Sequence, residues 1–108
     1  MRTLTRRLLQ QIPKGIDDIS IRVGRDVVHY ANCLALGSTY GNGVAFSGRV
    51  DGQPVEGQIP VESLWSERRA RKKALDVALE AIDYLSAIGV KVRLENRYIP
   101  KEFQSSVI

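Results

Sequence analysis

Residues 66–85 read SERRARKKALDVALEAIDYL, and this stretch decides the fold class because it predicts one long amphipathic helix. Small and apolar side chains recur every three or four positions, which is the spacing of one helix face. Because several of them are alanines, the helix is expected to approach a sheet closely. The expected buried face consists of Ala70, Ala74, Val77, Ala78, Ala81, Leu85 and Ile88.

Both ends of this helix are marked in the sequence. A serine, either Ser63 or Ser66, suits the N-cap, where a side-chain oxygen accepts from a free backbone N–H. Gly89 suits the position just past the C-terminus, which commonly has a positive φ. We therefore expect a helix over residues 64–88, about 35 Å long.

The charges of this helix run against its dipole. Five of the six residues from Arg68 to Lys73 are cationic, while Asp76, Glu80 and Asp83 follow toward the C-terminus. A helix carries partial positive charge at its N-terminus, so each misplaced cation costs roughly 0.3–1 kcal/mol. An anionic partner would offset this cost, and nucleic acid is the first candidate.

An exposed, solvated helix surface is the alternative interpretation of the same charges. Lys72 and Asp76 lie four residues apart and would then pair with each other. One flank of the helix, with Leu75, Leu79 and Ile82, is apolar enough to need cover. That cover would come from the N-terminal helix or from a second protomer.

The remaining sequence predicts a short helix and several strands. The strongest hairpin signal is Asp51-Gly52, while Gly24-Arg25 and Asn42-Gly43 suit two further turns. Pro54 and Pro60 place the strand that carries them at a sheet edge. The expected elements are a helix over residues 1–12, two strands within 16–30, and strands over 44–50, 53–61 and 90–99.

Together these elements predict an α+β fold. We expect an antiparallel sheet of about four strands, then a long helix packed on one face, then a last strand added to the sheet. The chain of 108 residues is 44% hydrophobic and 26% charged, which suits a single domain over residues 1–108. Within it, residues 1–14 form a basic N-terminal helix and residues 101–108 a tail.

The composition limits the possible functions. A net charge of +4 favours polyanionic partners. Cys33 and His29 are single residues of their type, which excludes a disulfide framework and Cys/His zinc sites. The glycine-rich loop over residues 37–43 lacks the Gly-Lys-Ser/Thr ending of a phosphate-binding loop. No long apolar run is present, so we expect a cytoplasmic protein without membrane contact. No residues of the sequence combine into a base, a nucleophile and oxyanion donors, so we also expect neither enzymatic activity nor a cofactor.

The opening of the long helix carries a first resemblance. Its serine, early cations and spaced alanines resemble the last helix of double-stranded RNA-binding domains, which opens Ser-Lys-Lys-x-Ala-Lys. The resemblance implies that the early cations reach phosphates across the major groove of duplex RNA. A strand over residues 90–99 does not belong to that fold. The residues that carry the resemblance are Ser66, Arg68, Ala70, Arg71, Ala74, Ala78 and Leu79.

A second resemblance rests on the order of elements. Three strands, a helix and a fourth strand over residues 27–99 resemble the first half of a ribonuclease H-like domain. Residues 77–82 are similar to the helix of that family, and residues 94–99 are similar to its fourth strand. Its first strand would correspond to residues 27–32.

The ribonuclease H-like resemblance also implies where metal-binding carboxylates belong. Asn32 and Arg71 stand at two of those positions and only Glu95 is acidic, while Glu67 lies one turn early. Two-metal hydrolysis needs several carboxylates, so the resemblance implies a truncated, non-catalytic variant. Partial folds of this kind also occur in small antitoxins that bind a toxin partner.

We therefore expect a non-enzymatic nucleic-acid-binding module, for DNA or RNA, that docks phosphates. One alternative is a protein–protein interaction module, oligomeric or antitoxin-like, which uses the Leu75 flank or a strand edge. Another is a metal-dependent nuclease that relies on Glu95. The expected phosphate-binding residues are Arg68, Arg69, Arg71, Lys72, Lys73, Arg93 and Arg97.

Overall fold

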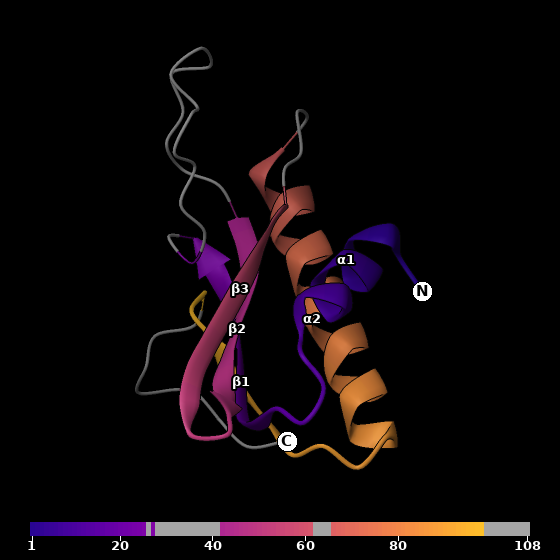
Figure 1. The fold of residues 1–108 in the computed structure, drawn as a ribbon. Helices are drawn as coiled ribbons and strands as arrows, with labels where there is room; N and C mark the ends of the chain where they lie inside the picture. Colours follow the sequence, from indigo (N-terminus) through magenta and orange to yellow (C-terminus); the bar gives the residue numbers. More distant parts are fainter. Residues whose placement is uncertain (26, 28–41, 62–65, 99–108) are drawn as a thin grey trace.

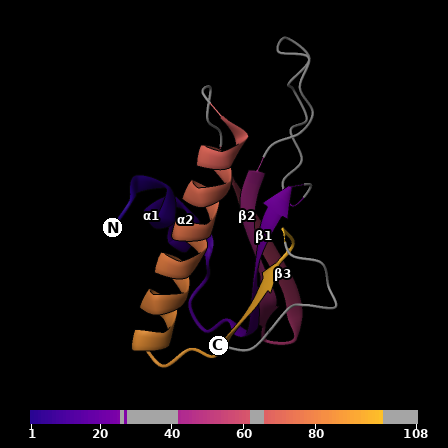
Figure 2. The same cartoon turned by 180° about the vertical axis from the view of Figure 1, so that it is seen from behind.

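The computed structural model describes residues 1–25, 27, 42–61 and 66–98. Its strands form a sheet with both helices on the same face (Figures 1 and 2). This arrangement is an α+β fold, as the sequence predicts. The elements are α1 (Thr3–Gln11), β1 (Asp17–Arg25), β2 (Asn42–Val50), β3 (Gln53–Val61), α2 (Glu67–Ala87) and β4 (Val92–Asn96).

The sheet is mostly antiparallel, with strand order β3-β2-β1-β4. β1 pairs antiparallel with β2, and β2 pairs antiparallel with β3. After α2 the chain returns to the far side of β1, where β4 runs parallel to it from Ile19 opposite Val92 to Val23 opposite Asn96. The predicted addition of a last strand to the sheet is confirmed.

The predicted turn at Gly24-Arg25 is wrong, because β1 continues through both residues and pairs Gly24 with Gly43. A β-carbon at Gly24 would come within 2.7 Å of the β-carbon of Arg97. This glycine therefore permits a close approach of two chain segments within the sheet. The turn predicted at Asn42-Gly43 is also wrong, since both residues lie in β2. The strand predicted after residue 27 falls outside the described residues.

The predicted hairpin at Asp51-Gly52 is confirmed. Asp51 and Gly52 have φ angles of 52° and 78°, as a turn of the primed type requires. The turn joins β2 to β3, which forms one edge of the sheet. That position agrees with the prediction from the prolines of β3.

Helix α2 packs its small residues on the sheet. Six of the seven predicted face residues are buried, whereas Ile88 is 59% exposed because it is the C-cap residue, past the last helical turn. Ile82, predicted on the apolar flank, is buried instead. The buried residues of α2 are Ala70, Ala74, Val77, Ala78, Ala81, Ile82 and Leu85.

The helix is shorter than predicted but has the predicted caps. Ser66 accepts a 3.0 Å hydrogen bond from the backbone N–H of Arg69. Gly89, with φ of +88°, donates to the carbonyl of Ser86, and the next N–H donates to the carbonyl of Leu85. These two bonds are those of a Schellman motif.

The core lies between the sheet and the helices. α1 inserts the fully buried Leu8 beside α2, and Phe46 of β2 is the largest fully buried side chain of the sheet. Neither α1 nor α2 has an apolar stretch long enough for a membrane crossing. The buried sheet residues include Ile19, Ile21, Val23, Val44, Phe46, Ile59, Val61 and Val92.

Candidate functional site

The acids in the middle of α2 are engaged by the N-terminus of the chain. Arg2 contacts Asp76 at 3.1 Å and Glu80 at 2.9 Å through its guanidinium nitrogens. The predicted pair of Lys72 with Asp76 is not formed, because the Asp76 carboxylate faces α1 and has Arg2 as its partner. A hydrogen bond from Thr5 and the nearby Arg2 lower the pKa of Glu80. These acids hold α1 on α2 and leave the cations earlier in the helix uncompensated.

Three cations gather around the N-terminus of α2. Arg68, Arg69 and Lys72, together with Ser66, line a hollow of about 630 Å³. All three cations are exposed, and among the described residues none has a carboxylate within 4 Å. We call these three residues the basic cluster. It adds full positive charges to the end of the helix that already carries the positive part of the dipole.

The other two predicted cations of α2 lie apart from this hollow. The guanidinium carbon of Arg71 is 4.8 Å from the centroid of the Tyr98 ring, a cation–π contact. Tyr98 also donates a hydrogen bond from its hydroxyl to Asn42. Arg71 is therefore directed toward the end of β4. Lys73 is exposed and has no ion pair in the described ranges.

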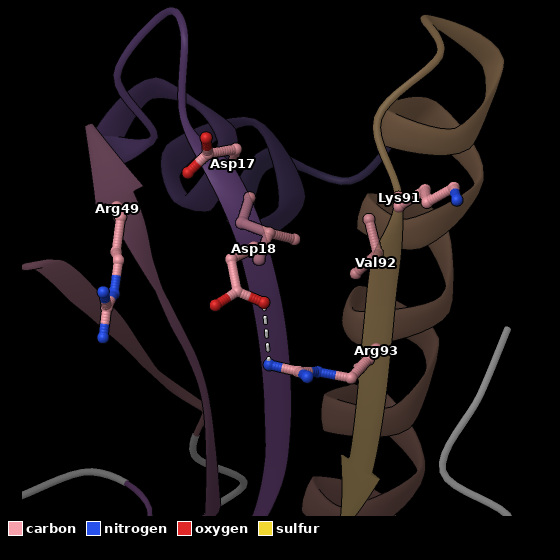
Figure 3. A pocket seen from close by; sticks show the side chains of 7 residues that line it. Asp17, Asp18, Arg49, Lys91, Val92 and Arg93 are labelled. Atoms are coloured by element: carbon pink, nitrogen blue, oxygen red, sulfur yellow. Dashed lines mark hydrogen bonds and ion pairs between the residues drawn. The ribbon is translucent and has the colours of Figure 1, made fainter. Parts of the chain in front are cut away.

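Arg93 does not join the cations of α2. Val92 is buried toward the helices, so the next side chain, Arg93, projects from the opposite face of the sheet. There its Nη2 atom lies 3.2 Å from Oδ1 of Asp18 (Figure 3). This pair lies in a hollow of about 680 Å³, which Arg49 and Lys91 also line.

Arg97 lies at the other end of β4. Its backbone N–H donates a 2.7 Å hydrogen bond to the carbonyl of Val23, directly before Tyr98 and the Arg71 contact. The structure thus separates the predicted binding residues. The hollow at the start of α2 is lined by Arg68, Arg69 and Lys72 alone among them. The other four lie outside it, and of these Arg93 is on the opposite face of the sheet.

No protein-family model, curated protein or solved structure matches this chain. The proposed function therefore rests on the arrangement of its own side chains.

The two acidic residues considered for a metal-dependent nuclease, Glu67 and Glu95, lie apart in separate surroundings. Glu67 forms a 2.9 Å ion pair with Arg25, and Glu95 lies opposite Arg22 in the β1–β4 pairing. Within the described ranges no three histidine, cysteine or acidic residues gather as a metal site would require. Asn32 lies outside the described residues. The central strand, which pairs with β2 and β4, is Asp17–Arg25, whereas residues 28–32 of the predicted first strand also lie outside the described residues.

The role of Arg2 and Thr5 has no mark in the local sequence. Both contact Glu80, which lies 78 and 75 residues further along the chain. No local pattern marks such a contact, because neither residue belongs to a charge pair at helical spacing. The one available signal is the pair of acids Asp76 and Glu80 in α2, which favours a cation from another element as their partner.

Proposed function

We propose that this protein is a non-enzymatic nucleic-acid-binding module that docks phosphates at the start of α2. The observation that carries the proposal is the basic cluster, whose cations have no acidic partner among the described residues. The acids that might have neutralised it, Asp76 and Glu80, bind Arg2 instead. A bound phosphate would relieve both the mutual repulsion of the cations and their conflict with the helix dipole.

The residue types of the basic cluster suit a phosphate backbone. Arg68 and Arg69 each offer a planar fork of donors that matches phosphate oxygens, and Lys72 adds a compact charge one turn later. Contacts of this kind position a nucleic acid without reading its sequence. The ring of Tyr98, which could have stacked on a base, has Arg71 over it. We therefore propose recognition of phosphates rather than of stacked bases.

The order of elements supports a ribonuclease H-like origin for this module. Three strands, a helix and a strand beside the first one form the order that this resemblance implies. β4 has no counterpart in a double-stranded RNA-binding domain, which favours the ribonuclease H-like resemblance. The arginine at position 71, where the resemblance implies a carboxylate, supports a role without catalysis.

Salt-dependent binding tests the proposal directly. The dissociation constants of labelled DNA and RNA duplexes are measured over a range of salt concentrations for the wild type and for Arg68→Gln/Arg69→Gln/Lys72→Gln. Since each phosphate contact with B-DNA contributes a slope of about 0.9, the variant is expected to lose up to about 3 from the slope of log K against log salt.

A matched control removes three exposed cations elsewhere. Arg6→Gln/Arg7→Gln/Lys14→Gln changes the net charge by the same amount, at and just beyond α1. It is expected to keep most of the wild-type slope. Equal losses in the two variants would mean diffuse attraction by net charge and not a site on α2. Absence of binding to either duplex at low salt would remove the proposal altogether.

A further inference from the structure

The two edges of the sheet differ in how open they are. At the β3 edge the side chain of Gln11 donates to the carbonyl of Gln58 at 3.0 Å and accepts from its N–H at 3.1 Å. The backbone groups of Gln58 therefore point away from β2, and so do those at alternate positions along β3. Pro54 and Pro60 occupy two of these outward positions and have no N–H to offer. This edge is blocked against a further strand.

The β4 edge has no such protection within the described part of the chain. The backbone N–H of Arg97 bonds to Val23 of β1, so alternate residues of β4 also turn toward β1. The residues between them, Val92 and Leu94, direct their N–H and C=O groups outward. Among the described residues no strand lies beyond β4, and β4 contains no proline.

A partly exposed flank of α2 lies on the same side as this open edge. Arg71, Leu75 and Leu79 are four residues apart and form one stripe along the helix. Because Arg71 contacts Tyr98 just after β4, this stripe faces the β4 side of the sheet. Leu79 is 47% exposed, while α1 occupies the other flank of α2 through Arg2 and Glu80.

We infer that a second copy of this chain binds here, with β4 antiparallel to its counterpart and Leu94 opposite Leu94. This register places Arg93 opposite Glu95 twice, once on each side of the twofold axis. A register centred on Glu95 would oppose two carboxylates, and one centred on Arg93 would oppose two guanidinium groups. Among registers centred on Arg93, Leu94 or Glu95, charge complementarity therefore selects Leu94.

The same register satisfies the backbone and the apolar flank. Leu94 points its N–H and C=O outward in both copies, so the central pair exchanges two hydrogen bonds. The two four-stranded sheets join into one, and the Leu75 and Leu79 flanks of the two α2 helices lie on the same side of the joined sheet and face the seam. Arg93 is available for the contact because it and Asp18 are each 59% exposed, which makes their ion pair weak. This dimer goes beyond the proposed phosphate binding and does not depend on it.

Charge exchange tests the inference. The monomer–dimer equilibrium of the full chain is measured by sedimentation equilibrium for the wild type, Arg93→Glu, Glu95→Arg and the double exchange. Each single change creates like-charge pairs at two symmetric points and is expected to weaken the dimer roughly tenfold or more. The double exchange restores opposite charges and is expected to restore the dimer.

Two further variants locate the interface. Glu56→Arg makes the same charge change as Glu95→Arg, but on the blocked β3 edge, and is expected to leave the dimer unchanged. Leu79→Gln replaces an exposed apolar side chain on the α2 flank and is expected to weaken the dimer. Circular dichroism confirms that each variant is folded. A wild type that stays monomeric at all accessible concentrations overturns the inference. So does a dimer that ignores the single changes, or one that the double exchange fails to restore.

Discussion

The hydroxyl of Thr5 donates a 2.6 Å hydrogen bond to Oε1 of Glu80 and so joins α1 to α2. Thr5 is fully buried, and the same carboxylate receives the backbone N–H and the guanidinium of Arg2. Next to these polar contacts Leu8 is fully buried in the core. The attachment of α1 therefore depends on a small polar network as well as on apolar burial.

Thr5→Val is expected to destabilise the protein by about 1–3 kcal/mol. The substitution keeps the shape of the side chain but removes the shorter of the two hydrogen bonds to Oε1 of Glu80, leaving the 3.2 Å bond from the backbone N–H of Arg2. Urea denaturation measures the free energy of unfolding. Thr3→Val, at an exposed position of the same helix, is the matched control and is expected to have little effect. Equal effects at both positions would contradict a specific role for the Thr5 hydrogen bond.

The stability of the protein is expected to depend on the ionisation of Glu80. The hydrogen bond from Thr5, followed by the contacts with Arg2, lowers the pKa of Glu80 below its ordinary value of 4.5. A lowered folded-state pKa contributes stability that is present above the unfolded-state value and is lost as the pH falls through the folded-state value. Glu80→Gln removes this contribution.

The measurement is the free energy of unfolding of wild type and Glu80→Gln between about pH 3 and pH 7. The wild type is expected to be the more stable at neutral pH, and the difference is expected to shrink below about pH 4.5. Glu56→Gln, which removes an exposed carboxylate from β3, controls for the change in net charge. A difference that stays constant over the whole range would contradict the role of the Glu80 carboxylate.

Local patterns predicted most of the elements but not all of their contacts. The spacing of small residues in α2, its Ser66 cap and the Asp51-Gly52 turn are local features, and each is confirmed. At Gly24 the turn prediction fails because glycine suits both turns and close packing, and only the position of Arg97 decides between them. The basic cluster could be predicted as a charge run. Its lack of acidic partners could not, because that depends on Arg2 from the start of the chain.

Gly24→Ala is expected to destabilise the fold by about 1–3 kcal/mol, because β1 and the segment after β4 would have to move apart. The new methyl group would lie 2.7 Å from the β-carbon and 3.4 Å from the α-carbon of Arg97. Urea denaturation measures the loss. Gly52→Ala provides a contrast, since that position is open but has φ of +78° and is expected to lose about 1 kcal/mol through backbone strain. A neutral Gly24→Ala would show that the segment at Arg97 adapts freely.

Removing cations from the basic cluster is expected to stabilise the free protein. Arg68 and Arg69 lie in the first turn of α2, so each conflicts with the helix dipole. Arg68→Gln and Arg69→Gln are each expected to raise the free energy of unfolding by about 0.3–1 kcal/mol at low ionic strength. High salt is expected to reduce this gain in stability, because both arginine side chains are exposed and dissolved ions screen their repulsion by the helix dipole.

The same substitutions are expected to reduce stabilisation by a polyanion. A nucleic-acid duplex that binds only the folded protein raises its Tm by an amount that increases with the affinity, so the wild type is expected to gain more than either variant. Thermal unfolding with and without duplex measures both effects in one experiment. A variant that is more stable alone and less stabilised by the duplex would show that these arginines are kept for a ligand at a cost to the fold. If Arg68→Gln and Arg69→Gln instead destabilise the free protein, these side chains have structural partners within the chain, and the basic cluster loses its standing as a binding site.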